Sequence, residues 1–393
     1  MDFRFTPEEE AFRQEICKFV KNEPPEDFPW QGEDEGYGFG GWSYEYLRRL
    51  GEKGWISRCW PIEYGGQGRP LMDLFILFNE LAYQWAPIQA FFFLQAVCSA
   101  IMHFGSEELK KEILPRAATG EITFWEGFSE PEAGSDMLAL TTAAVKGDDS
   151  YIISGQKTWG SNAHRASHGL IAVRTDSEAP RHRGISMFLI DMKSPGVTTR
   201  PIVAMHGSAP FAEVFFDGVR VPRGRLVGEE NKGFQQILEC LEWDRFWGRF
   251  NFASSCQRML EEIIKYAKET KRNGVVLAKD PLVRHKLAQL AIEIDVSHVI
   301  AYQAIYLLNR GETLNYEASV IKTFADELLQ RVDYTGMEIL GIYSQLEETS
   351  KWVPLKGRLK RWYLCSPLFT IAGGSSEIQR NTIATRGLGL PRS

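Results

Sequence analysis

The sequence predicts an α+β fold in which a small β-domain lies between two helical domains. Apolar residues recur at helical spacing along 1–120, short β-type segments fill 121–230, and helical spacing returns along 231–393. A chain of 393 residues also exceeds what one hydrophobic core usually supports. We therefore expect an N-terminal α-helical domain, a middle β-domain and a C-terminal α-helical domain with these boundaries.

The N-terminal domain should begin with a helix. Thr6 and Glu9 have the spacing of a capping box, and Pro7 occupies the first helical position. A loop rich in Pro, Gly and acidic residues is expected over 24–41. Further helices are expected in WSYEYLRRLGEKGW (42–55), LMDLFILFNELAYQ (71–84) and SEELKKEILPRAATG (106–120).

The middle of the chain has the composition of β-strands. Stretches rich in β-branched and aromatic residues alternate with Gly, Pro, Asp and Ser. These stretches are ITFWEGF (122–128), YIISGQKTW (151–159), GLIAVRT (169–175), GISMFLIDM (184–192), VTTRPIV (197–203) and AEVFFDGVRVP (212–222). They predict a small β-domain.

Long helical patterns dominate the last part of the chain. They cover 233–269, 281–311 and 317–341, and no internal repeat or low-complexity tract interrupts them. The order of elements is helices, strands and then long helices, which is an α+β pattern with the β-domain inserted between two helical layers.

Composition argues against several classes of protein. The formal net charge is −6 and the basic residues form no long face with interleaved aromatics, so we expect no nucleic-acid partner. The six cysteines are far apart and the N-terminus lacks signal-peptide features, which favours reduced thiols and a cytoplasmic location. The uncharged stretch 81–106 is long enough to cross a bilayer, but Pro87 interrupts it and polar residues are scattered around it. We expect a buried core helix there and no membrane span.

Metal and nucleotide motifs are also missing. His164 and His168 are four residues apart in a predicted turn with no third ligand nearby, so we expect no metal site. No G-x-S-x-G elbow occurs, and YGGQG (64–68) is not a G-x-G-x-x-G motif. Neither a hydrolase nor a Rossmann site is predicted.

Three stretches fit neither a core helix nor a core strand. They are GFSEPEAGSD (127–136), GQKTWGSNA (155–163) and IAGGSSEIQRNTIATRGLGLPR (371–392). In the third, Gly-Gly-Ser-Ser precedes a helical pattern, so backbone N–H groups could receive phosphate oxygens. A simple helix cap would use the same residues, and both interpretations stay open on this evidence alone.

Taken together, the three stretches resemble the signatures of the acyl-CoA dehydrogenase family of flavoproteins. WPIEYGGQG (60–68), FGSEELKKEILPRAATGE (104–121) and VFFDGVRVPRGRLVGEENKGF (214–234) are further matches, so the resemblance covers nearly the whole chain in order. It implies an N-terminal α-domain, a middle β-domain and a C-terminal four-helix domain with FAD at their junction. It also implies an acyl-CoA substrate.

The resemblance assigns cofactor and substrate contacts residue by residue. Phe128 and Ser129 would lie at the isoalloxazine, and Trp159 with Ser161 would line the flavin from the second stretch. Ser135 would meet the acyl-CoA. The remaining cofactor contacts that it implies are Gly374, Ser375 and Glu377 of the C-terminal signature and Arg272, which in many members reaches the FAD of a neighbouring subunit.

The family needs a base that takes the α-proton of the thioester while the β-hydrogen leaves as hydride to the flavin. One family location for this base, just before the Gly of the C-terminal signature, is occupied here by Gly373, which cannot serve. The other location precedes an Arg in the first long C-terminal helix, and here the pair is Asp244-Arg245. We expect Asp244 to be the base and Arg245 to contact substrate. A structural ion pair between Asp244 and a neighbouring Arg is the alternative.

Some elements depart from the family pattern. The Arg-x-x-Phe-Gly element lacks its Phe near Arg272, and Glu338 stands where a Gln is expected. Such departures resemble the large subunits of two-subunit relatives, in which one chain can lose part of a site that its partner completes. The four-helix C-terminal domain that the resemblance implies would pack with others of its kind into a tetramer, either a homotetramer or a heterotetramer. The resemblance also implies an electron-transfer flavoprotein as acceptor. A non-catalytic partner subunit and a flavin oxidase or monooxygenase are the alternative functions.

Overall fold

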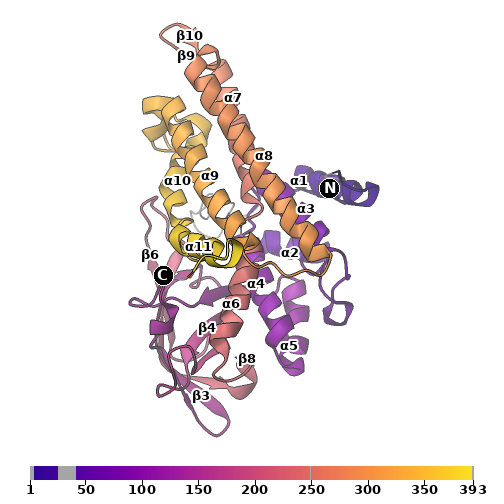
Figure 1. The fold of residues 1–393 in the computed structure, drawn as a ribbon, viewed down its shortest axis with the longest axis vertical. Coiled ribbons are helices and arrows are strands. Elements are labelled where there is room, and N and C mark those ends of the chain that lie inside the picture. Colours follow the sequence, from indigo (N-terminus) through magenta and orange to yellow (C-terminus); the bar gives the residue numbers. More distant parts are fainter. Residues whose placement is uncertain (1–3, 25–40, 248, 392–393) are drawn as a thin grey trace.

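The computed structural model describes residues 4–24, 41–247 and 249–391, apart from the side chains of 242–247. The β-sheet forms the lower end of the molecule in Figure 1, the long C-terminal helices form the upper end, and the N-terminal helices lie to one side of their junction. This is the α+β arrangement that the periodicity predicts.

The N-terminal helices follow the expected pattern. They are α1 (Pro7–Asn22), α2 (Tyr44–Glu52), α3 (Leu71–Tyr83), α4 (Gln89–Phe104) and α5 (Glu107–Ala118). The capping box is confirmed, because Thr6 Oγ1 accepts from Glu9 N at 3.2 Å and Glu9 Oε2 accepts from Thr6 N at 2.7 Å. The uncharged stretch 81–106 is divided between the end of α3 and α4, and α4 is a largely buried core helix.

The β-domain contains a strand at each predicted stretch. Its strands are β1 (Phe124–Gly127), β2 (Ala143–Lys146), β3 (Ser150–Ser161), β4 (His168–Arg174), β5 (Ile185–Asp191), β6 (Val197–Ile202), β7 (Phe211–Pro222) and β8 (Leu226–Val227). The spatial order is β6-β7-β3-β2-β4-β5-β8, and β1 pairs with β4 in parallel. The short strands β2 (AAVK) and β8 (LV) were not predicted. So few residues carry little periodicity, and neither strand contains the aromatic residues that mark β1.

The C-terminal part is a helical bundle. Its helices are α6 (Gly233–Trp247), α7 (Phe252–Glu269), α8 (Pro281–Asn309), α9 (Glu317–Leu340), α10 (Arg358–Cys365) and α11 (Ser376–Thr382), the last followed by a π-helical turn (Ile383–Gly387). A small hairpin, β9 (Lys271–Arg272) and β10 (Val275–Val276), forms the tip of the bundle farthest from the β-sheet (Figure 1).

The helical pattern over 233–269 forms two separate helices, α6 and α7. The backbone turns between them, and Phe252 N donates to Arg249 O at 3.1 Å. Arg249 is drawn inward by Asp326 of α9, with 2.8 Å between Arg249 Nε and Asp326 Oδ1.

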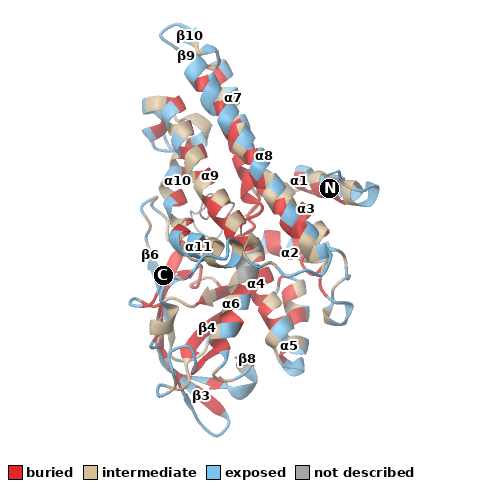
Figure 2. Cartoon of the chain, viewed as in Figure 1, coloured by how far each residue is buried: buried red, intermediate tan, exposed pale blue. Residues whose placement is uncertain are grey.

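Buried residues occur in the N-terminal helices, the β-sheet and the C-terminal helices (Figure 2). Among the described residues they form two hydrophobic cores. One joins the N-terminal helices to the β-sheet and includes residues of α6, α8 and α9, and the other fills the rest of the C-terminal bundle. Phe211, at the start of β7, belongs to the second core. The β-domain therefore contributes a side chain to the C-terminal core at the junction of the three units.

Candidate active site

The segment that follows β1 lies beside the end of β3. Ser129 is the second residue after β1, and its carbonyl accepts from Thr158 N of β3 at 3.0 Å. The pairing of β3 with β7 shifts register between Lys157 and Gly160. The hydrogen bond between Thr158 and Ser129 brings two of the three unusual stretches of the sequence into direct contact, and it places Phe128, Ser129 and Trp159 on neighbouring segments.

Trp159 has an unusual conformation for a large aromatic residue. Its backbone lies in the left-handed region at φ 59°, and the residue is 59% exposed. Its ring packs edge-on against Phe211, with centroids 5.9 Å apart. A non-glycine residue keeps a left-handed backbone only where its surroundings fix it, and such strain often marks a functional site. An exposed indole beside a strand irregularity suits a planar cofactor ring.

A buried ion pair also joins these two segments. Lys157 Nζ donates to Glu130 Oε1 at 2.7 Å, and Lys157 is fully buried. Burial lowers the pKa of Lys157 to about 8, although Glu130 opposes the shift. Burial alone would raise the pKa of Glu130, but the charge and hydrogen bond of Lys157 outweigh it and lower that pKa to about 2. Both side chains are therefore charged at neutral pH.

Ser135 lies on the exposed loop that follows this pair. Its neighbour Asp136 forms an ion pair with Arg181 at 2.6 Å. Arg174 donates to Leu138 O at 2.9 Å and to the carbonyls of the turn that contains Arg181. The loop is therefore tied to the β4–β5 connection, and Ser135 is accessible from solvent.

The C-terminal signature is a helix start preceded by two left-handed glycines. Gly373 and Gly374 have φ of 69° and 92°, and Ser375 caps α11 by accepting from Ile378 N. Gln379 Nε2 donates to the carbonyls of both glycines, at 3.1 and 3.3 Å. Glu377 is exposed on the first turn of α11. The backbone N–H groups at this end are compatible with an anionic ligand.

A second buried charge cluster contacts the segment that leads into the C-terminal signature. Lys322 and Asp326 of α9 are fully buried and lie 2.9 Å apart, and Arg249 contacts the same carboxylate. Lys322 Nζ also donates to Phe369 O at 2.9 Å, four residues before Gly373. The cluster therefore joins the turn after α6 to the segment that leads into the signature.

The predicted base lies on α6. Asp244 and Arg245 are in its last turn, and their side chains lie outside the part of the chain that the structure describes. α6 packs against α4 and α9. Asp244 therefore stays a prediction that rests on its position in the sequence and on this helix.

Arg272 is far from the other predicted contacts. It lies on β9 at the tip of the bundle, away from the ends of β1 and β3 (Figure 1). Its Nη2 donates to Ile339 O at 2.8 Å. Within one chain the structure does not bring Arg272 to the other cofactor residues, so a contact with FAD requires a second subunit.

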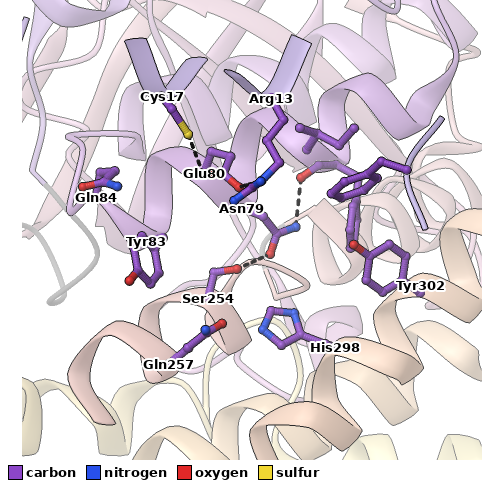
Figure 3. A pocket seen from close by; sticks show the side chains of 13 residues that line it. Arg13, Cys17, Asn79, Glu80, Tyr83, Gln84, Ser254, Gln257, His298 and Tyr302 are labelled. Atoms are coloured by element: carbon purple, nitrogen blue, oxygen red, sulfur yellow. Dashed lines mark hydrogen bonds and ion pairs between the residues drawn. The ribbon is translucent and has the colours of Figure 1, made fainter. Parts of the chain in front are cut away.

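A separate cavity of about 320 Å³ lies among α1, α3, α7 and α8 (Figure 3). Arg13 pairs with Glu80 there at 2.6 Å, Cys17 donates to the same carboxylate, and Ser254 donates to Asn79. None of the residues predicted for the site lines it. Among the residues that the structure describes, no His, Cys, Asp or Glu side chains group as a metal site.

Comparison with known proteins agrees with this geometry. The acyl-CoA dehydrogenase N-terminal, middle and C-terminal domain models match residues 6–121, 126–219 and 231–388. Acyl-CoA dehydrogenase FadE26 of Mycobacterium tuberculosis is 33% identical, with both chains covered completely. The chain belongs to the acyl-CoA dehydrogenase family. This acyl-CoA dehydrogenase is therefore an oxidoreductase whose cofactor is FAD.

Two solved structures are especially similar to this acyl-CoA dehydrogenase. The Tcur3481-Tcur3483 steroid ACAD has a TM-score of 0.90 at 31% identity, with 100% of each chain covered. The ChsE4-ChsE5 complex from Mycobacterium tuberculosis has a TM-score of 0.86 at 30% identity and the same coverage. They confirm the predicted fold class.

The sequence did not assign a role to Glu130 or Lys157, although both lie inside quoted signatures. A charged residue amid small and polar residues usually lies on the surface. The only sequence signal was their place beside Ser129 and Trp159.

Proposed function

We propose that this acyl-CoA dehydrogenase removes the α- and β-hydrogens of an acyl-CoA thioester to give the 2-enoyl-CoA. The observation that carries the proposal is the junction at the sheet edge. There the ends of β1 and β3 are bonded through Ser129 and Thr158, and Trp159 projects from them beside Phe211 of the C-terminal core. The domain boundaries 1–120, 121–230 and 231–393 remain part of this proposal.

In the proposed reaction, FAD accepts the β-hydrogen as hydride when it is bound. Asp244 takes the α-proton, and the electron pair of the broken Cα–H bond forms the new double bond. A carboxylate in a dry pocket has a raised proton affinity, which suits a base. Phe128, Ser129, Trp159 and Ser161 would hold the flavin ring, and Gly374, Ser375 and Glu377 would contact its other groups.

Substrate and partner contacts are also proposals. Ser135 and Arg245 would contact the acyl-CoA, and an electron-transfer flavoprotein would receive the electrons. The chain would work in the cytoplasm, where its six free cysteines stay reduced.

Assembly into a tetramer is supported by the surface of α8. By length and composition α8 could cross a bilayer, as no other described helix could. Ile292, Val296 and Val299 are exposed on it at helical spacing. We propose that this stripe packs against another subunit, which would also bring Arg272 near a neighbour's cofactor. The two complexes named above make a heterotetramer the favoured form.

The test of the proposed reaction is Asp244→Asn in the FAD-loaded protein. We expect turnover to fall by roughly 10²–10⁴-fold, because the variant cannot accept the α-proton, while FAD stays bound. The visible absorption of the purified variant measures bound FAD. Its anaerobic bleaching by a panel of acyl-CoA thioesters measures the reaction. An active Asp244→Asn variant would remove Asp244 as the base.

The same assay separates the alternative functions. A wild-type flavin that no thioester bleaches would indicate a non-catalytic subunit, which Gly373 at the other base position favours. Oxygen consumption without an added acceptor would indicate an oxidase or monooxygenase instead.

A further inference from the structure

Glu130 accepts an unusually complete set of hydrogen bonds. Its Oε2 accepts from Thr141 N at 2.7 Å and Thr141 Oγ1 at 2.9 Å. Its Oε1 accepts from Thr142 N at 3.0 Å and Lys157 Nζ at 2.7 Å. Four donors match the four lone-pair sites of a carboxylate, so the side chain has one possible orientation.

The two residues of the ion pair lie within one or two residues of predicted cofactor contacts. Glu130 directly follows Ser129, and Lys157 precedes Trp159 by two residues. The residue between, Thr158, donates its N–H to Ser129 O at 3.0 Å. A backbone hydrogen bond and a side-chain ion pair thus join the same two segments at successive positions.

Further hydrogen bonds connect the segments next to the Glu130–Lys157 pair. Thr142 Oγ1 donates to Gln156 O at 3.1 Å, next to Lys157. Arg174 N donates to Thr142 O at 2.7 Å, which ties the Thr141–Thr142 segment to β4. Glu130 and Ala133 also exchange backbone hydrogen bonds of 2.9 and 3.1 Å, which close the turn toward Ser135. Movement of the carboxylate would disturb all three segments together.

Buried ion pairs in general contribute little net stability compared with apolar residues of similar volume. They do fix geometry, because each charge is costly unless its partner stays at hydrogen-bond distance. A buried pair whose carboxylate has all its acceptor sites occupied, and which lies between two proposed ligand-binding segments, is suited to positioning.

We propose that Glu130 and Lys157 are positioning residues of the cofactor site, which hold Ser129 and Trp159 in the arrangement that receives FAD. This inference rests on the proposed contacts of FAD with Phe128, Ser129 and Trp159. It assigns a role to the two charged residues of the signatures that the reaction itself does not use.

The test compares Glu130→Gln, Lys157→Met and the double variant. Each single variant leaves one buried charge unpaired, so both FAD affinity and thermal stability should fall. The double variant removes both charges, so its unfolding temperature should return toward wild type. Its dissociation constant for FAD should stay roughly 10–100-fold higher, the usual scale for residues that support a binding group. Quenching of flavin fluorescence by apoprotein and the band shape of bound flavin give two readouts independent of turnover.

A matched control is Asp73→Asn in the N-terminal helices. Asp73 is also buried and pairs with Arg58 at 2.7 Å and Arg69 at 3.1 Å. This variant should lose stability and keep FAD affinity. If the double variant regains FAD affinity together with stability, the positioning role is overturned. The same holds if Asp73→Asn loses as much FAD affinity as the Glu130 and Lys157 variants.

Trp159→Ala separates this inference from the contacts on which it rests. If Trp159→Ala leaves FAD affinity unchanged, the proposed contact between Trp159 and FAD is wrong, and the positioning role of Glu130 and Lys157 falls with it. If Trp159→Ala weakens FAD but the double variant does not, the contact stands and the positioning role alone is wrong.

Discussion

At the scale of single residues, three glycines of the β-domain pack so closely against one indole ring that a side chain would not fit. Trp125 is fully buried in β1, and a Cβ on Gly127, Gly160 or Gly169 would lie 2.4–2.9 Å from its ring atoms. Two of these glycines lie inside the unusual stretches of the sequence. Their purpose is close packing on Trp125, and the cofactor is not needed to explain them.

Gly160→Ala should therefore destabilise the protein. The new methyl group would lie 2.9 Å from two ring carbons of Trp125 and 3.0 Å from Ala163 Cβ, so the ring or β3 must shift. Overpacking of this kind costs about 1–3 kcal/mol of unfolding free energy. Gly134→Ala is the matched control in the neighbouring loop, because nothing lies within 4 Å of its Cβ position. Thermal denaturation measures both, and equal unfolding temperatures would contradict the packing account.

Two buried aspartates of α9 differ in how their charge is compensated. Asp326 pairs with Arg249 and Lys322. Asp333 is also fully buried, and burial raises its pKa well above the ordinary value, with only a partial opposing effect from Ser366. Asp333 is thus protonated in the folded chain at a pH where the unfolded chain has lost that proton.

This difference predicts that Asp333→Asn raises the thermal stability of the protein by an amount that depends on pH. A raised folded pKa means that the folded state binds more protons, so wild-type stability declines as pH rises above the ordinary pKa of 3.8. Asp333→Asn should unfold at a higher temperature than wild type at pH 8, with a smaller gap at pH 5. Each kcal/mol gained corresponds to roughly 2–4 °C. Asp326→Asn, which breaks two ion pairs, should instead lower the unfolding temperature at both pH values. A gain for Asp333→Asn that does not vary with pH would contradict the titration.

At the scale of elements, α8 differs from the other long helices. Its Ile292, Val296 and Val299 are exposed, whereas α9 is buried along most of its length. The outer face of α8 is coloured largely as exposed in Figure 2. An apolar stripe on a long helix is typical of helix–helix contact between subunits.

Val296→Lys should weaken the oligomer, because a charge in an apolar helix contact has no partner there. We expect a shift to a smaller mass in light scattering coupled to gel filtration, with an unchanged helical signal in circular dichroism. Val145→Lys is the control, since Val145 is 67% exposed on β2 of the β-domain. An unchanged mass for Val296→Lys would place the subunit contact elsewhere.

At the scale of the whole molecule, the two cores meet at the proposed cofactor site. The first core includes the N-terminal helices, the sheet and residues of α6, α8 and α9, such as Ile237, Ala301 and Ile321. The second is the rest of the C-terminal bundle with Phe211. Trp159 lies between them through its contact with Phe211. A ligand at this junction would contact both cores and strengthen the coupling of their unfolding, to which the packing of α3 on α7 and α8 also contributes.

Removal of FAD should therefore change the shape of thermal unfolding as well as its midpoint. The holoprotein should unfold in a single calorimetric transition, and the apoprotein should unfold at lower temperature in two overlapping ones. Bound ligand stabilises by mass action, so the midpoint should rise with added FAD. An apoprotein with one transition at the holoprotein's temperature would show that FAD does not bridge the cores.

The sequence by itself determined the α+β class, the capped first helix, six strands and the family, because each depends on local periodicity or on motifs in fixed order. Only the tertiary structure decided that Glu130 and Lys157 meet across 27 residues, that α6 and α7 separate at Arg249, and that Arg272 lies at the bundle tip. Spacing along the chain reports contacts within a few residues. A buried ion pair or a helix break depends on strand register and on side chains from distant elements, which no local pattern encodes.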